Sequence, residues 1–130
     1  MGHPERIVQT PELGNPEQFG YSNVVKVDNL VFLAGQCAID DNYNAVGDFA
    51  AQSREVLERV VRGVEAAGGT RDDIVTMTVY MLDVANGRIF TEIRKEMFGR
   101  DFPASTVVGV NQLMPPNALV EVTAMAVLAD

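Results

Sequence analysis

Two segments of this 130-residue chain, residues 74–82 and 119–128, are apolar or β-branched at nearly every position. Such runs are typical of strands that are covered on both faces of a sheet. The chain offers only two helical segments as cover, and both fit on one face of the sheet. A second copy of the chain is the simplest cover for the other face, so the sequence predicts an oligomer.

The two helices are predicted over residues 48–67 and 85–98. In the first, apolar residues recur at a spacing of 3.6 and form one stripe, with charged residues on the rest of the surface. Asp48 is a suitable N-cap, and Gly68 follows the last turn. Both helices are therefore expected to pack one apolar face against a sheet.

Four further strands complete the predicted pattern, each rich in β-branched or apolar residues and bounded by turn residues. They cover residues 6–9, 21–27, 30–34 and 105–110. The element order is then β-β-β-α-β-α-β-β. We expect a single α+β domain over residues 1–130, with a mixed sheet, two helices on one face, and a flexible tail at residues 1–5.

Composition argues against several function classes. A net charge of −8 disfavours nucleic acid and anionic membranes as main partners. Cys37 and His3 are the only cysteine and the only histidine, so we expect neither an intrachain disulfide nor a metal site. No apolar run approaches the roughly 20 residues that span a bilayer, and residues 1–6 lack the apolar stretch of a secretory signal. We expect a cytoplasmic protein.

Glu121 is the one carboxylate within the apolar segment 119–128. Strand alternation places it on the same face as Leu119 and Thr123. A buried carboxylate has a raised pKa and can act as a general acid or base near neutral pH. The alternative is a glutamate at the rim of the sheet, paired with a neighbouring arginine.

Other candidate residues each have a functional and a structural interpretation. Cys37 is either a pocket thiol or a small half-buried residue, and the second is commoner for a lone cysteine. Tyr21 either presents its phenol to a ligand or serves as an amphipathic strand residue. Gly35 either allows close approach of a ligand or ends a strand. The hydroxyls of Ser105 and Thr106 face a ligand or satisfy local backbone groups.

Short motifs spread over residues 21–128 resemble those of the Rid family, also called YjgF/YER057c/UK114. Each motif is short, and their order and spacing together make the resemblance specific. The matching pieces are Gly20-Tyr21-Ser22, Leu33-Ala34-Gly35-Gln36, Ala51-Gln52-Ser53-Arg54, Val64-Glu65-Ala66-Ala67-Gly68-Gly69, Asp73-Ile74-Val75, Val79-Tyr80-Met81-Leu82-Asp83, Phe102-Pro103-Ala104 and Ala118-Leu119-Val120-Glu121-Val122.

The resemblance implies a chorismate-mutase-like two-layer fold and a homotrimer with a central barrel and ligand clefts between subunits. It also implies a deaminase that hydrolyses imines and enamines left by pyridoxal-phosphate dehydratases, without a metal or cofactor. In such a site, Glu121 helps to activate water and Tyr21 lines the cleft. Backbone around Gly35 and Val107 contacts the ligand or the water.

The sequence departs from the family pattern at Ser105, where the deaminases carry an arginine that binds the substrate carboxylate. A serine cannot replace a bidentate guanidinium. The usual proline after the Gly-Gln pair is replaced around Cys37 and Ala38, and Thr91 stands where asparagine is frequent. The chain thus looks like an arginine-less branch, unless Arg54, Arg88, Arg94 or another basic side chain reaches the cleft and takes over the anchor.

Three functions are possible for this protein, and the first two use the small-molecule cleft. The first is an enzyme that processes an imine or enamine by acid–base chemistry of Glu121, and the second is a ligand-binding trimer without turnover. The third is the endoribonuclease or translation-inhibitor role attached to some family members, against which the negative net charge counts. Glu121 is the expected catalytic residue. The expected substrate-binding residues are Tyr21, Gly35, Cys37, Thr91, Ser105, Thr106 and Val107.

Overall fold

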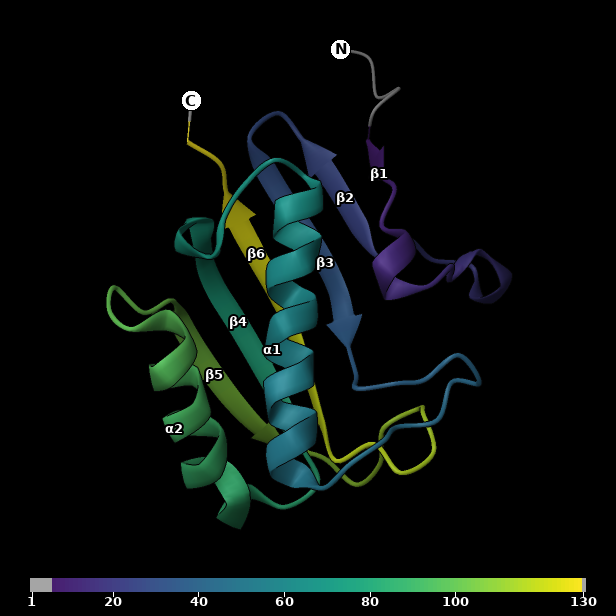
Figure 1. Ribbon diagram of the computed structural model, residues 1–130, viewed down its shortest axis with the longest axis vertical. Helices are drawn as coiled ribbons and strands as arrows, with labels where there is room; N and C mark the ends of the chain where they lie inside the picture. Colours follow the sequence, from purple (N-terminus) through teal and green to yellow (C-terminus); the bar gives the residue numbers. More distant parts are fainter. Residues whose placement is uncertain (1–5, 130) are drawn as a thin grey trace.

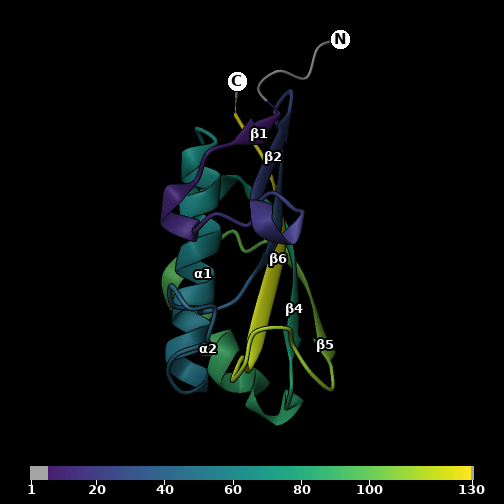
Figure 2. The same cartoon turned by 90° about the vertical axis from the view of Figure 1, so that its right-hand side faces the viewer.

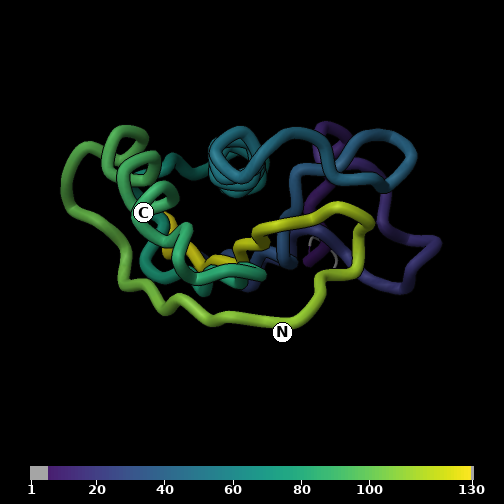
Figure 3. The backbone as a smooth tube through the Cα atoms, turned by 90° about the horizontal axis from the view of Figure 1, so that it is seen from below, coloured from purple at the N-terminus to yellow at the C-terminus, as the bar shows by residue number. Residues whose placement is uncertain are grey.

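The structure is a computed structural model that describes residues 6–129, so the tail expected at residues 1–5 lies outside the described residues. One mixed sheet forms the first layer and two helices form the second (Figures 1 and 2). Both helices pack on the same face of the sheet, which is also visible from below in Figure 3. This is the two-layer α+β arrangement that the sequence predicts.

The six strands are arranged in the order β1-β2-β3-β6-β4-β5. Their bounds are Ile7–Val8 for β1, Val24–Val27 for β2, Leu30–Gln36 for β3, Ile74–Met81 for β4, Ala104–Gly109 for β5 and Val120–Val127 for β6. Neighbouring strands are antiparallel except for β4 and β5, which are parallel and joined through a helix. The two apolar segments, β4 and β6, are therefore central neighbours.

Helix α1 (Phe49–Ala66) begins as predicted, because Asp48 Oδ1 accepts a hydrogen bond of 2.9 Å from the Ala51 N–H. Helix α2 (Gly87–Phe98) follows a short 3₁₀ turn and forms the crossover between β4 and β5. Such a crossover is how two parallel neighbouring strands are joined. Further 3₁₀ turns cover Pro11–Leu13, Glu17–Phe19 and Arg71–Asp73.

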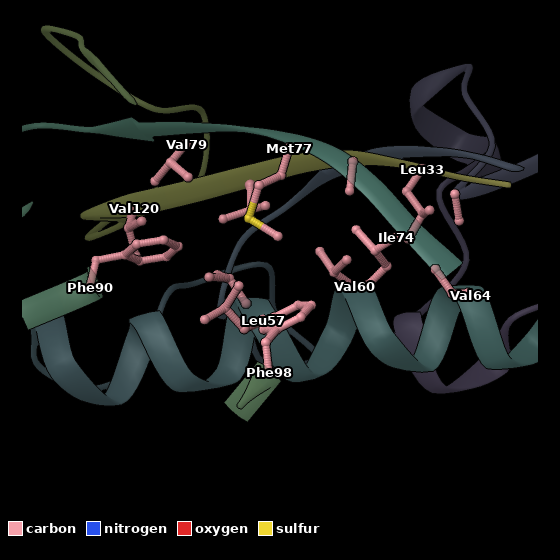
Figure 4. Close-up of a cluster of buried hydrophobic side chains, with 14 of the residues drawn as sticks. Leu33, Leu57, Val60, Val64, Ile74, Met77, Val79, Phe90, Phe98 and Val120 are labelled. Carbon is pink, nitrogen blue, oxygen red and sulfur yellow. The ribbon is translucent and has the colours of Figure 1, made fainter. Parts of the chain in front are cut away.

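The hydrophobic core lies between the sheet and the helices (Figure 4). Leu57 from α1, Phe90 from α2 and Met77 from β4 are buried there almost completely. Burying each such side chain contributes roughly 1.5–3 kcal/mol. Strand β6 alternates between buried and partly exposed residues along its length, so only one of its faces belongs to this core.

The face of the sheet turned away from the helices is more polar than the sequence pattern indicates. On β4 and β6 it carries Thr76, Thr78, Tyr80 and Thr123, each partly exposed. Threonine is β-branched and favours strands as valine does, so the pattern did not separate the two faces. No helix of residues 6–129 covers this face, and Phe32 is 37% exposed on it.

Two strand boundaries near the expected site differ from the prediction. Tyr21 precedes β2, which begins only at Val24, and β3 continues through Gly35 to Gln36. Gly20 adopts φ of 79°, a left-handed conformation, and the chain there follows the 3₁₀ turn rather than the sheet. The strand predicted over residues 21–27 is therefore shortened at its start.

Candidate functional site

A cavity of about 230 Å³ lies beside the end of β3. Strand β2 pairs with β3 as far as Val24 opposite Leu33, and the Ala34 N–H donates one further hydrogen bond of 2.8 Å to the Asn23 carbonyl, so the pairing of β3 on that side ends at Ala34. The segment before β2 and the loops after β3 and β5 surround this end of β3 without filling the space beside it. Four of the expected site residues line the cavity: Tyr21, Gly35, Cys37 and Glu121.

A β-bulge in β3 positions Gly35 against Glu121. Leu33 pairs with Ala124 and Gln36 pairs with Val122, so β3 has one more residue than β6 in this interval. A Cβ atom on Gly35 would lie 2.8 Å from Glu121 Cδ and 3.2 Å from its Cγ, and would overlap the carboxylate. The carboxylate therefore occupies space that only a glycine at position 35 leaves free.

Cys37 holds the other side of this carboxylate. Its thiol donates a hydrogen bond of 3.3 Å to Glu121 Oε1, and the residue is only 6% exposed. Burial raises the pKa of Cys37, and the charge and hydrogen bond of Glu121 raise it further. The thiol thus stays protonated near neutral pH, so it serves as a donor and not as a nucleophile.

Glu121 has no arginine partner in the part of the chain that the structure describes. Its carboxylate is absent from the ion pairs within 4.0 Å among residues 6–129. The alternative of a rim glutamate paired with a neighbouring arginine is therefore not what the chain forms. Oε2, on the Gly35 side, is left to accept a proton from a bound molecule.

Two tyrosines line the cavity together. Burial raises the pKa of Tyr21. Tyr43 raises this pKa further, through its charge and through a side-chain hydrogen bond. The ring of Tyr43 lies 5.1 Å from that of Phe19. The sequence pattern does not point to Tyr43, because this residue falls in a polar turn, residues 40–44, where an aromatic side chain carries no specific signal.

Arg59 of α1 also reaches the cavity, and sequence reasoning placed it on the solvated face of the helix. It is 6% exposed. Its Nε donates a hydrogen bond of 3.0 Å to Gln36 Oε1, and Nη2 donates one of 2.9 Å to the Leu13 carbonyl. The available signal was its spacing of three residues from Val56 and four from Gly63, which places it on the buried face.

The remaining expected site residues lie elsewhere in the chain. Ser105, Thr106 and Val107 are exposed on β5, and Thr91 is exposed on α2. Strand β4 separates β5 from β6, so a single chain does not bring these residues to the Glu121 cavity. The predicted site residues therefore form two groups at opposite parts of the sheet.

Arg94 occupies the neighbourhood of Ser105. Its Nη1 donates a hydrogen bond of 2.6 Å to Ser105 Oγ, and the guanidinium carbon lies 5.1 Å from the centre of the Phe90 ring. Burial lowers the pKa of Arg94. An arginine from α2 thus places its charge near the position at which the sequence pattern lacks one.

Two kinds of feature are absent from the part of the chain that the structure describes. Within residues 6–129, no group of three or more histidine, cysteine, aspartate or glutamate side chains is placed to hold a metal ion. In the same range no helix is long and apolar enough to cross a membrane. The polar side chains that line the cavity carry a carboxylate, a thiol, two phenols, a guanidinium and two amides.

The fold and the cavity define a class: a two-layer protein with a chorismate-mutase-like fold and a carboxylate set over a glycine in a β-bulge. The sequence profile described as Endoribonuclease L-PSP matches residues 15–128. The chain belongs to this family, which is also known as the YjgF/YER057c/UK114 or Rid family.

Similar proteins carry several names. A RutC family protein of Pyrococcus horikoshii is 37% identical over 85% of this chain and 90% of its own. A 3-aminoacrylate deaminase of Acinetobacter baylyi is 33% identical, covering 95% and 98%. A 2-iminobutanoate/2-iminopropanoate deaminase of Dermatophagoides farinae is 31% identical, covering 96% and 98%. The crystal structure of the YjgF gene product of E. coli superposes with a TM-score of 0.84 at 29% identity, covering 95% and 98%.

Proposed function

We propose that the protein is a hydrolase that deaminates a small imine or enamine without a cofactor, with Glu121 as its catalytic residue. The observation that carries this proposal is the Glu121 carboxylate, held by the Cys37 thiol over Gly35 at the wall of a cavity and free of any arginine among the described residues. The names of two relatives, an iminobutanoate deaminase and an aminoacrylate deaminase, support the same reaction type.

The chemistry required of Glu121 is that of a general base. Oε1 accepts the Cys37 hydrogen bond, so Oε2 is free to take a proton from water. The water oxygen attacks the imine carbon, the proton passes to the nitrogen, and the C–N bond breaks. One imine and one water thus become one carbonyl compound and one ammonia. General acid–base catalysis of this kind typically contributes about 10²–10⁴-fold.

A homotrimer would bring the two groups of site residues together. The uncovered sheet face and the exposed β5 edge supply surface for contact between copies. In the trimer that we propose, Ser105, Thr106, Val107 and Thr91 of one subunit lie beside the Glu121 cavity of the next. The small-molecule cleft is then formed between subunits, as the family resemblance implies.

The family resemblance implies that Ser105 sets this protein apart from deaminases that act on 2-iminopropanoate. Its hydroxyl provides no fixed charge for a substrate carboxylate, and a bidentate guanidinium contact is lost. The preferred substrate is therefore held by contacts with other residues of the protein, and not by a side chain at position 105.

The test is ammonia release from imines generated in situ, with wild type and Glu121→Gln compared in parallel. Turnover above buffer that Glu121→Gln abolishes supports the proposal. A rate equal to buffer with every small imine and enamine, together with retained ligand binding, would instead indicate a non-catalytic binding trimer. Cleavage of a structured RNA without imine hydrolysis would favour the endoribonuclease role.

A further inference from the structure

We propose that Arg59 is the anion-binding residue of the cavity and that it receives a carboxylate group of the small molecule that binds there. The inference rests on the proposed function for the reaction that follows, but the binding itself is tested without turnover. It assigns to α1 an electrostatic role that Ser105 on β5 cannot perform. The substrate class is accordingly a small imine or enamine that carries a carboxylate.

The first observation is a buried cation without a carboxylate partner. Arg59 is 6% exposed, and among residues 6–129 no aspartate or glutamate oxygen lies within 4.0 Å of its nitrogens. Glu55 acts on Arg59 only through space, because its carboxylate bonds to Arg62 Nη1 at 3.3 Å. Buried charges in proteins are normally paired, so a bound anion would complete this site.

The second observation is that the guanidinium is fixed and still has donors to spare. A guanidinium carries five N–H groups, and the described hydrogen bonds use Nε toward Gln36 and Nη2 toward Leu13. Within residues 6–129, no hydrogen bond is formed by Nη1. Since Arg59 lines the cavity and its side chain is already held, a ligand meets donors that lose little conformational freedom on binding.

The third observation is where the two charges lie. Glu121 extends from the sheet face away from the helices, whereas Arg59 arrives from α1 on the opposite face. Both nevertheless line one cavity, together with residues 34–37 at the end of β3. A bound molecule can therefore place its carboxylate at Arg59 and its reacting carbon at Glu121, away from carboxylate–carboxylate repulsion.

The cavity has room for a small molecule. Its volume is about 230 Å³, and Tyr21, Tyr43 and Arg59 also line an adjoining hollow. A molecule of a few carbon atoms with one carboxylate and one imine nitrogen fits such a space. Arg94, in contrast, does not line this cavity.

The primary experiment compares propionate with propionamide, its neutral isostere, on the wild-type protein. The chain has three tyrosines and no tryptophan, and Tyr21 and Tyr43 line the cavity, so tyrosine fluorescence reports binding. We expect propionate to bind at least about tenfold more tightly than propionamide, because a charge-assisted hydrogen bond to a guanidinium is stronger than a neutral one. Equal affinities for the two probes would overturn the proposal.

Variants identify the residue that is responsible. Arg59→Met keeps the aliphatic stem and removes the charge, so the preference for propionate should disappear, whereas Arg59→Lys should retain part of it. The matched control is Arg54→Met on the same helix, where the side chain is exposed and the preference should be unchanged. Loss of the preference in Arg94→Ala with retention in Arg59→Met would overturn the assignment. If Arg59→Met fails to fold, the preference for propionate over propionamide is compared between wild type and Arg59→Lys. A preference that Arg59→Lys leaves unchanged would then overturn the assignment.

The same titrations on Glu121→Gln separate this inference from the proposed reaction. Propionate binding that depends on Arg59, in a protein whose imine turnover survives Glu121→Gln, would keep the anion site and refute the catalytic proposal. Turnover that depends on Glu121, in a protein that binds propionate and propionamide equally, would do the reverse.

Discussion

The carboxylate of Glu121 fills the space directly above Gly35, so the two residues cannot both have side chains there. We predict that Gly35→Ala lowers imine turnover by about a hundredfold, because the new methyl group displaces the general base. The free energy of unfolding should change little, since the clashing atoms are the end of a flexible side chain and Gly35 has no positive φ.

Steady-state kinetics and thermal unfolding of Gly35→Ala check this pair of expectations. Gly87→Ala is the control, because a Cβ at position 87 meets nothing within 4 Å and alanine favours the helix. Full activity in Gly35→Ala would show that the position of the Glu121 carboxylate does not matter.

Removing only the charge of that carboxylate is the second prediction. Glu121→Gln keeps the size of the side chain, and we expect turnover of an active substrate to fall by at least about a hundredfold. The control is Glu96→Gln, an exposed glutamate on α2, which should leave the rate unchanged. A rate within twofold of wild type in Glu121→Gln would remove Glu121 from the mechanism.

The Cys37 thiol provides a prediction about pH. Its pKa is raised in the folded protein, first by burial and then by Glu121, whereas the unfolded chain titrates near the ordinary value of about 8.5. Above that pH the unfolded chain loses a proton that the folded protein keeps. The free energy of unfolding should therefore be unaffected below about pH 8.5 and should fall above it, by about 1.4 kcal/mol per pH unit.

Urea unfolding at pH 7, 8.5 and 9.5 measures this slope, and Cys37→Ala should remove it. Tyr21 also has a raised pKa, but its ordinary value near 10 places its contribution at higher pH. An unchanged slope in Cys37→Ala would mean that the thiol ionises as readily in the folded protein as in the unfolded chain.

Sequence patterns predict the helices and the sheet strands, and they also single out Glu121. All three predictions depend on the periodicity of apolar residues. Periodicity reports which residues share a face, and a single carboxylate in an apolar strand departs visibly from that pattern. The Cys37–Glu121 hydrogen bond joins residues 84 positions apart, and local patterns carry no information at that separation.

Arg59 and the threonines of the open sheet face show a different limit. An arginine is normally assigned to the solvated side of a helix. Its aliphatic stem can nevertheless be buried when its N–H groups find acceptors, and here Gln36 and Leu13 accept hydrogen bonds from Arg59. Thr78 and Thr123 fit the strand pattern as well as the apolar residues do, because branching at Cβ, and not polarity, determines strand preference.

Oligomeric state is the fourth prediction. We expect a particle of three times the 14.1 kDa chain mass in sedimentation equilibrium at micromolar concentration. Thr78→Glu places a charge in the middle of the uncovered sheet face and should dissociate the trimer, because burying an unpaired carboxylate is costly. Ala50→Glu on the exposed side of α1 is the control and should remain trimeric. A wild-type monomer at this concentration would contradict the trimer.

The last prediction concerns Ser105. Arg59 comes from α1 and not from β5, so it does not hold the carboxylate of a 2-imino acid where an arginine at position 105 would. Without a guanidinium at position 105, we expect kcat/KM for 2-iminopropanoate and 2-iminobutanoate to lie about one to two orders of magnitude below that of an arginine-bearing family deaminase. Ser105→Arg alone would bring a second guanidinium next to Arg94, whose Nη1 is 2.6 Å from Ser105 Oγ, and like charges repel.

The double variant Ser105→Arg, Arg94→Ala removes that repulsion, so it should gain more activity on these imino acids than Ser105→Arg alone. Arg94→Ala by itself is the control and should gain nothing, because it adds no anchor. The measurement is kcat/KM for each imino acid generated in situ, with the arginine-bearing deaminase assayed in parallel. Wild-type activity equal to that enzyme would show that the β5 position is not where these carboxylates bind, because an arginine already in the chain then holds them.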